Sequence, residues 1–376
     1  MKSQSFTLDL AGKTLTAEFT DLTEKASGSV LLKYGETAIL VTAVMSDRES
    51  GAPYFPLSVE FEEKFYAAGQ ILGSRFQRRE GRPSDEAILS ARIVDRTIRP
   101  LFNQRIRNDV QIVVTVLAMG DDDPDVLGVI GASLALSVSD IPWRGPVGAI
   151  RIGRKVDGGE LIVNPTYTER KEGLLDFEVL ACGKDGSINM VETAAEEVTE
   201  SEIAGAFEKA VEQHTALEAW QKEIVAAVGK EKNPDPVFEV PVEITSLFEN
   251  GFKQRLSETI FSDRAGKSHI YELKNEFVAA VVEQELDEHI ASELFEEEID
   301  KELHRGALVD GKRADGRGMD DVRELYAKAG DVSPVLHGSG IFYRGGTHIF
   351  SALTLGGPEA AQLIDTIESQ DSKKRF

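Results

Sequence analysis

The densest group of residues that could do chemistry is a run of arginines between positions 75 and 107. This stretch holds nine Arg and four acidic residues, a local charge of +5 (9 − 4), on a chain whose formal charge is −23. Every basic residue in it is Arg, and a guanidinium binds phosphate oxygens in a bidentate manner and stacks on bases, which an ammonium group does not. We therefore predict a local nucleic-acid site on an otherwise acidic protein.

These arginines divide into a loop and a helix. In the loop an aromatic side chain accompanies four cations, a combination used on single-stranded nucleic acid. The candidate RNA-binding residues of the loop are Arg75, Phe76, Arg78, Arg79 and Arg82. Pro83-Ser84 then starts a helix by N-cap chemistry. Along this helix Arg92, Arg96 and Arg99 are spaced i, i+4, i+7, so they share one face and extend the candidate site.

The same helix also has a structural interpretation. Asp85, Glu86 and Asp95 could pair with its arginines, and a solvated, salt-bridged face is the usual role of a charge run. Three arginines on one face, directly after an Arg/Phe loop, favour the binding interpretation. The apolar residues expected on the opposite face, towards the core, are Ala87, Val94 and Ile98.

The elements that must position this site are predicted from the apolar pattern. Thr37–Val44 and Val110–Leu117 are continuous β-rich runs typical of buried central strands. Val126–Val138 is apolar nearly all round and predicts a buried helix. Lys184-Asp185-Gly186 predicts a hairpin turn between two strands. The fold class expected for residues 1–200 is therefore α+β.

Two changes of pattern follow along the chain. From Ser201 helical periodicity dominates, with Thr199 or Ser201 as the cap, and it continues to about residue 305. From Gly306 the mixed pattern returns and repeats the beginning, because residues 28–39 match residues 338–349 at a constant offset of 310 (338 − 28). Such a repeat predicts two copies of one domain, of which the second ends early.

Cysteine and histidine usage argues against a metal site. Cys182 is the single cysteine, so no internal disulfide can form, and a reducing, cytoplasmic setting fits. The six histidines show no ligand spacing. Residues 121–125 (DDDPD) could hold a divalent ion or cap the following helix, and capping is the preferred interpretation. No metal ligand is assigned, and no apolar run approaches the ~20 residues of a membrane span.

Residues 79–84 (REGRPS) and 92–102 (RIVDRTIRPLF) resemble the signature of the first core domain of polynucleotide phosphorylases. Residues 313–317 (RADGR) stand where the second core of that family should begin. The resemblance implies RNase PH-like α+β cores joined by an all-helical domain. The expected domains are a first core at 1–200, a helical domain at 201–305 and a truncated start of a second core at 306–376.

The resemblance also implies a function. Members of this family are phosphate-dependent 3′-to-5′ exoribonucleases that release nucleoside diphosphates from RNA. They form a homotrimer around a pore, with the Arg/aromatic loop at its entrance. Mg²⁺ and inorganic phosphate are expected for the full-length enzyme, single-stranded RNA is the expected partner, and no DNA or membrane partner is expected.

The catalytic groups that the resemblance implies belong to a part of the second core that follows residue 376. They include adjacent serines and an Asp-x-Lys, where the first core has Asp123-Pro124-Asp125 and Asp176-Phe177-Glu178. No catalytic residue is therefore assigned in this chain, and the chain alone is expected to be inactive. The alternatives are a non-catalytic RNA-binding or assembly module and a chain without retained function.

Overall fold

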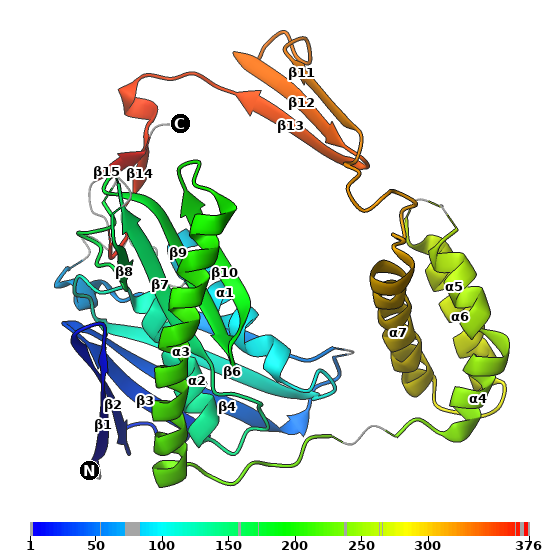
Figure 1. The fold of residues 1–376 in the computed structure, drawn as a ribbon, viewed down its shortest axis with the longest axis horizontal. Helices are drawn as coiled ribbons and strands as arrows, with labels where there is room; N and C mark the ends of the chain where they lie inside the picture. Colours follow the sequence, from blue (N-terminus) through cyan, green and yellow to red (C-terminus); the bar gives the residue numbers. More distant parts are fainter. Residues whose placement is uncertain are drawn as a thin grey trace. The chain divides into compact units, whose positions relative to one another are not determined.

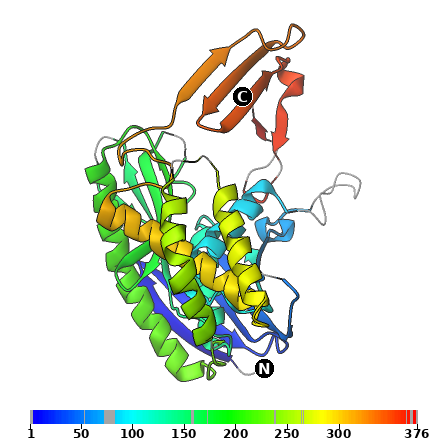
Figure 2. The same cartoon turned by 90° about the vertical axis from the view of Figure 1, so that its right-hand side faces the viewer.

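The computed structural model describes residues 3–52, 54–71, 83–156, 159–171, 173–236, 239–262, 264, 266–364, 366–368 and 372–374. Figures 1 and 2 show the chain in two views. It separates into two compact units. The first unit combines residues 1–236 with residues 362–376, and the second contains residues 237–361.

The first unit contains a six-stranded sheet in the order β1-β2-β3-β4-β6-β5. Its strands are β1 (Ser3–Leu10), β2 (Lys13–Thr20), β3 (Gly28–Tyr34), β4 (Thr37–Glu49), β5 (Leu57–Glu62) and β6 (Asn108–Ala118). The two apolar runs expected as central strands are β4 and β6, which lie side by side and antiparallel. The N-terminal strand lies at the edge of this sheet, and β5 joins β6 in parallel at the other edge.

A second sheet of the same unit has the order β10-β9-β7-β8. Its strands are β7 (Gly148–Lys155), β8 (Leu161–Val163), β9 (Leu175–Lys184) and β10 (Ser187–Ala195). The hairpin expected between β9 and β10 is confirmed. Asp185 and Gly186 form its two-residue turn, and both have positive φ, 50° and 77°, as type I′ turns require.

Two helices, α1 (Asp85–Ile98) and α2 (Pro124–Val138), lie between the two sheets. α1 contacts β5 and β10, and α2 contacts β3, β4 and β7. Because α2 is covered on both sides, it is apolar nearly all round, as its sequence indicates. A Cβ at Gly131 would lie 2.5 Å from Val41 Cγ2, so this glycine lets the helix approach β4 closely.

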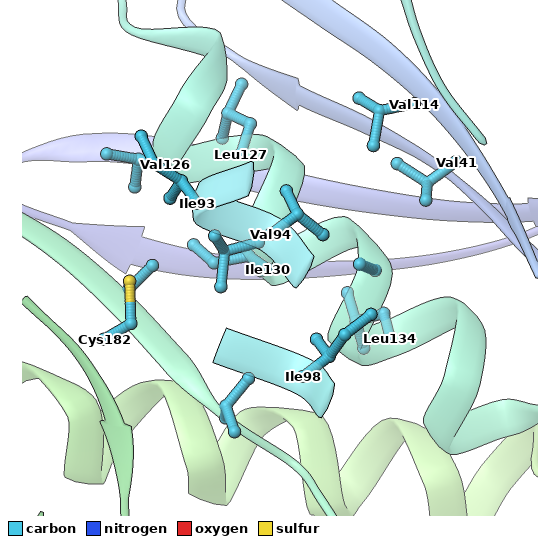
Figure 3. Close-up of a cluster of buried hydrophobic side chains, with 14 of the residues drawn as sticks. Val41, Ile93, Val94, Ile98, Val114, Val126, Leu127, Ile130, Leu134 and Cys182 are labelled. Atoms are coloured by element: carbon cyan, nitrogen blue, oxygen red, sulfur yellow. The ribbon is translucent and has the colours of Figure 1, made fainter. Parts of the chain in front are cut away.

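Figure 3 shows the core where α1 and α2 meet beneath the sheet. Its labelled residues include Val41, Ile93, Val94, Ile98, Val114, Val126, Leu127, Ile130 and Leu134. All of these side chains are buried, and full burial of such a side chain stabilises the fold by on the order of 1.5–3 kcal/mol. The apolar face of α1 expected from the sequence is confirmed, because Ala87, Val94 and Ile98 are among the buried residues.

The third helix of this unit, α3 (Glu200–Val228), has a capping box at Thr199. It packs on β7, β9 and α2. In the contact pattern the first unit therefore continues past residue 200 to Pro236, and a segment of the expected 306–376 domain, residues 362–376, also belongs to it. The composition changes near residue 199 because the chain passes there from a strand to a helix. A new folding unit does not have to begin at such a change.

The second unit contains helices α4 (Val242–Gly251), α5 (Lys253–Ile260), α6 (Ser268–Val282) and α7 (Glu288–Arg305), followed by a π-helical turn, Gly306–Asp310. Their core is separate from that of the first unit. Phe248, Phe277 and Phe295 form its centre, with ring centroids 5.5–5.9 Å apart. Within the described part of the chain, no helix is both long and apolar enough to cross a bilayer.

The second unit also contains a three-stranded sheet that copies part of the first sheet. Its strands are β11 (Leu325–Ala329), β12 (Gly338–Arg344) and β13 (Thr347–Leu353). Leu15 pairs with Tyr34 in the first sheet, and Leu325 pairs with Arg344 in this one, an offset of 310 on both strands (325 − 15, 344 − 34). The repeat predicted from the sequence is therefore confirmed in strand position and register.

Candidate nucleic-acid interface and the charged cluster at α2

α1 positions the arginines of the candidate nucleic-acid interface. Ser84 caps its N-terminus, accepting a hydrogen bond from the Ala87 amide at 2.9 Å and donating one to Glu63 Oε2 at 2.6 Å. The loop residues expected to bind RNA, Arg75, Phe76, Arg78, Arg79 and Arg82, lie outside the described residues.

The arginines of α1 and the arginine that caps its C-terminus, Arg99, differ in their surroundings. Arg99 is held by the protein itself, because it pairs with Asp95 at 2.8 Å and donates to the Leu57 carbonyl at 3.1 Å. Its guanidinium also lies over the Phe55 ring, 5.9 Å from the centroid. Arg99 therefore joins α1 to the segment that precedes β5, which leaves it less available to a ligand.

Arg92 and Arg96 are exposed on the same helix. Arg96 pairs with Glu192 of β10 at 2.9 Å, but both side chains are half exposed, so this pair is weak and open to competition. Among the residues that the structure describes, Arg92 has no hydrogen-bond or ion-pair partner. These two arginines are the cations of α1 that could reach a phosphate.

A second polar site lies at the N-terminus of α2, where the sequence places Asp123-Pro124-Asp125. Asp123 caps the helix by accepting from the Asp125 amide at 2.8 Å. Capping, preferred over ion binding from the sequence, is thus observed, although the helix begins at Pro124 instead of Val126 because proline suits the first helical position. The Asp123 side chain is 5 % exposed, so its charge needs partners.

Those partners are two arginines that the sequence analysis did not single out. Arg151 of β7 donates from Nε to Asp123 Oδ2 at 2.6 Å, and Arg170, in the β8–β9 connection, donates to the same oxygen at 3.1 Å. Arg170 also holds Glu178 of β9 with two hydrogen bonds, at 2.6 and 3.0 Å. The cluster is a closed set of ion pairs between β7, β9 and α2.

The electrostatics of the cluster follow from this geometry. Burial disfavours the charge of Asp123, but the Arg151 and Arg170 guanidiniums outweigh it and lower the pKa of that carboxyl. Burial raises the pKa of Asp125 to about 7, and the neighbouring charge of Asp123 adds to the effect. The first carboxylate is thus held ionised, whereas the second carries a proton over part of the neutral range.

Asp176 is also engaged in an ion pair. It is the one position at which the first core keeps the aspartate of the expected Asp-x-Lys. It pairs with Arg154 at 2.7 Å, and Arg154 reaches Glu202 of α3 at 2.6 Å. These contacts give Asp176 a structural role, in which it holds β9 to β7 and, through Arg154, to α3. The sequence signal that could have found the arginine partners is an Arg inside an apolar strand, residues 148–154 (GAIRIGR), since a buried cation requires a carboxylate.

The cluster does not fit the cofactor or the co-substrate that the resemblance implies. Within the described ranges no three His, Cys, Asp or Glu side chains are grouped to hold a metal ion. A Mg²⁺ ion at Asp123 would meet two guanidiniums, and a phosphate would meet the charges of Asp123 and Glu178. The charged cluster at α2 therefore provides no place for either.

Comparison with known proteins agrees with this fold. A family model described as 3′ exoribonuclease family, domain 1, matches residues 11–142, and the model of domain 2 matches residues 145–213. Together they span α1, α2, the four-stranded sheet and every strand of the six-stranded sheet except β1. The chain belongs to the 3′ exoribonuclease family.

Its curated relatives are more particular. The chain is 38 % identical over 379 residues to the polyribonucleotide nucleotidyltransferase of Bacillus cytotoxicus, covering 99 % of this chain and 52 % of that protein. It is 39 % identical over 379 residues to that of Heliobacterium modesticaldum and 38 % identical over 375 residues to that of Bacillus subtilis, with 52 % of each covered. The chain thus spans about half the length of these relatives. A crystal structure of rice (Oryza sativa) Rrp46 matches 60 % of this chain and 94 % of its own, at 14 % identity and a TM-score of 0.44, a likeness too slight to add to the assignment.

Proposed function

We propose that this chain forms part of a polyribonucleotide nucleotidyltransferase, which degrades RNA from its 3′ end with inorganic phosphate and releases nucleoside diphosphates. Within that enzyme the first unit binds single-stranded RNA and does not perform the chemistry. The observation that carries the proposal is the closed cluster at α2, where the Asp123 carboxylate lies between Arg151 and Arg170. The Asp123 carboxylate therefore already occupies the place between these two guanidiniums that an anion would need.

Phosphorolysis needs donors aimed at two phosphate groups and a means of stabilising developing charge. In the first unit the guanidiniums near α2 already donate to Asp123 and Glu178. We therefore assign the chemistry to the second core of the full-length enzyme, together with the Mg²⁺ requirement. Homotrimer formation and a cytoplasmic setting are part of the same proposal.

For RNA binding we propose the loop arginines together with Arg92 and Arg96, and we assign Arg99 to bracing α1. If about three cations reach phosphates, log K should fall against log salt with a slope of roughly −2, at about −0.7 per phosphate on single strands. Phe76 would add base stacking of on the order of 1–3 kcal/mol. The acidic remainder of the chain should make the slope shallower, because salt screens its repulsion.

A salt titration of fluorescent oligo(A) binding tests this assignment. Replacing Arg92 by Ala should weaken binding evenly across sequences and flatten the slope by up to about 0.7, the share of one phosphate contact. The Arg78/Arg79 double alanine variant should do so more strongly. Lys25→Ala, which removes an exposed cation from the turn before β3, is the matched control and should leave both quantities unchanged.

The experiment tests the assignment of the loop and the assignment of α1 to RNA binding separately. If the Arg78/Arg79 variant binds with wild-type affinity and slope, the loop is not the RNA site. If only Arg92→Ala is silent, the RNA path does not extend along α1. If Lys25→Ala weakens binding as much as the others, the interaction is diffuse attraction to any cation.

A further inference from the structure

The three-stranded sheet of the second unit, drawn in orange in Figure 1, carries aromatic side chains on one face. Alternate residues of a strand point to the same face, and directly paired residues of neighbouring strands share it. The pairing of β11 with β12 and of β12 with β13 therefore arranges six side chains in two rows. The first row is Tyr326, Tyr343 and His348, and the second is Lys328, Ile341 and Phe350. We call this surface the aromatic face.

The repeat shows that the aromatic face is the outward side of this sheet. In the first sheet Leu32 faces α2, because a Cβ added to Gly131 of α2 would lie 3.2 Å from its Cδ1. Phe342 is the counterpart of Leu32 at the offset of 310 (342 − 32), so Phe342 occupies the helix-facing side. The opposite side of the first sheet meets solvent and carries the ion pair of Lys33 with Glu18, at 2.7 Å. The aromatic face corresponds to that solvent side.

The outward side differs in chemistry between the two copies. In the first sheet its six positions hold no ring: they are Thr16, Glu18, Leu31, Lys33, Ala38 and Leu40. In the second sheet four of the six hold a ring, and Lys328 stands where the first copy has Glu18. Residues 15–43 carry a charge of −2 (2 − 4), whereas residues 325–353 carry +1 (2 − 1). On a chain of −23 this sheet is therefore a local region of positive charge.

The side chains of the aromatic face are accessible. Tyr326 and Phe350 are 52 % and 56 % exposed. Tyr343 is half-buried beside His348, with ring centroids 4.9 Å apart. Lys328 lies 3.9 Å from Asp331, and an exposed pair at this distance is weak. Among the residues that the structure describes, none of the six belongs to either hydrophobic core, so they are free to contact a ligand.

Rings on neighbouring strands of a small antiparallel sheet are a platform on which single-stranded RNA stacks its bases. Tyr343 and Phe350 lie on adjacent strands in successive rows, so they are about 7 Å apart and each ring can take its own base. Lys328 lies in the same row as Phe350 and supplies a cation for a phosphate. A protein partner fits less well, because stable interfaces use about 20–30 residues a side around an apolar centre. Only Ile341 and Phe350 are wholly apolar here.

We propose that the aromatic face binds single-stranded RNA by stacking two successive bases on Tyr343 and Phe350, while Lys328 contacts a phosphate. The site belongs to the second unit and is distinct from the arginines of the first unit. It rests on the proposed function for the nature of its ligand, single-stranded RNA. Because every base has a π-face, the aromatic face strengthens the hold on RNA without selecting a sequence.

The two sites should differ in their response to salt. The aromatic face offers one cation, which predicts a slope no steeper than about −0.7 in log K against log salt. The arginine site should have a slope of roughly −2. Since stacking does not depend on counterion release, the aromatic face should hold a rising share of the bound RNA as the salt concentration increases.

Photo-cross-linking on the whole chain locates each site. Oligo(U) that carries 4-thiouridine is irradiated with the protein at low and at high salt, and cross-linked tryptic peptides are quantified by mass spectrometry. Tyr326, Tyr343 and Phe350 fall in three different tryptic peptides, residues 324–328, 329–344 and 345–373. Peptides from residues 72–99 report on the arginine site. We expect cross-links in both sets at low salt and mainly in the three sheet peptides at high salt.

Substitutions on β12 separate stacking from packing. Tyr343→Leu keeps an apolar side chain but removes the ring, so sheet cross-linking and affinity at high salt should fall by about fivefold to 150-fold, the share of one stacked base. Tyr343→Phe keeps the ring and should retain both. Phe342→Leu, on the opposite side of the same strand, is the control and should alter neither. Amide hydrogen exchange in β12 and β13 checks that the sheet is kept, and Phe350→Leu repeats the comparison if Tyr343→Leu disrupts it.

The distribution of cross-links decides between the two sites. Cross-links in residues 72–99 and none in the three sheet peptides overturn this inference and leave the proposed function standing. Cross-links in the sheet peptides alone support the inference and exclude the arginine site, and no cross-link anywhere contradicts both. Equal losses from Tyr343→Leu and Phe342→Leu exclude stacking on this face. Dimers of the chain that Tyr343→Leu abolishes, without sheet cross-links, assign the face to a second copy and overturn the inference.

Discussion

At the residue scale, we expect substitution of Asp123 to lower the free energy of unfolding strongly. Its carboxylate is enclosed and holds two arginines, so Asp123→Asn leaves Arg151 with too little compensating charge in a buried place. Breaking a buried ion pair by removing one partner costs about 3–5 kcal/mol. We expect a loss of this size in the free energy of unfolding measured with urea. Glu212→Gln, which breaks the exposed Lys209–Glu212 pair, is the control and should change it far less.

The pH dependence of the same variant has a definite sign. Because the pKa of Asp123 is lowered in the folded protein, its contribution is fully present above its ordinary value of 3.8 and is lost as the pH falls further. The difference in unfolding free energy between wild type and Asp123→Asn should therefore shrink as the pH falls below 3.8, where the carboxylate of Asp123 takes up its proton. At higher pH the variant also removes the charge that raises the pKa of Asp125, so the acidic range is the one that reports on Asp123 itself. A difference that stays constant or grows below pH 3.8 would contradict the ion-pair account of this cluster.

The residue scale also shows where sequence reasoning stops. The buried side of α1 could be predicted because a helix places Ala87, Val94 and Ile98 on one face by local geometry. The bracing of Arg99 could not, since its carbonyl partner at Leu57 lies 42 positions away in the chain. The arginine partners of Asp123 were missed for the same reason. The spacing of residues along a helix indicates which side chains share a face. It does not indicate which other elements that face contacts.

At the scale of elements, a substitution in α3 tests whether this helix belongs to the first unit. Ser133 of α2 donates to Gln221 of α3 at 2.6 Å, and Gln221 donates to the Val147 carbonyl at 2.7 Å. Gln221→Ala leaves these buried groups without partners, at a cost of on the order of 1–3 kcal/mol. Urea unfolding should show the first unit destabilised, with the helices of the second unit unaffected because their core is separate.

The control for this variant is Gln254→Ala, which removes an exposed glutamine of α5 whose side chain donates to Glu258. It should leave the first unit unchanged. If Gln221→Ala instead destabilises the helices of the second unit, α3 belongs with them, as the sequence boundary at residue 200 suggested. The strands and helices could largely be predicted, because their periodicity is a local property of the sequence. The unit to which α3 belongs could not, because it depends on hydrogen bonds between residues more than 70 positions apart in the chain.

At the scale of the whole molecule, the repeat at an offset of 310 and the Arg-rich signature located the family from sequence alone. The register of the copied strands could be predicted because the turn residues and apolar positions recur together. What the sequence did not reveal is that residues 362–376 return to the first unit, because no local pattern in those residues specifies a partner. We propose that this chain binds RNA, whereas the chemistry requires groups that its described residues do not supply.

The most direct test of that account is a phosphorolysis assay on the rigorously purified chain. Labelled oligo(A) is incubated with inorganic phosphate and Mg²⁺, nucleoside diphosphate is quantified, and a full-length polyribonucleotide nucleotidyltransferase serves as the positive control. We predict that the chain binds the oligonucleotide in a salt-dependent manner and releases no nucleoside diphosphate above background. Release that requires both phosphate and Mg²⁺ and that rises in proportion to the concentration of this chain would contradict the account.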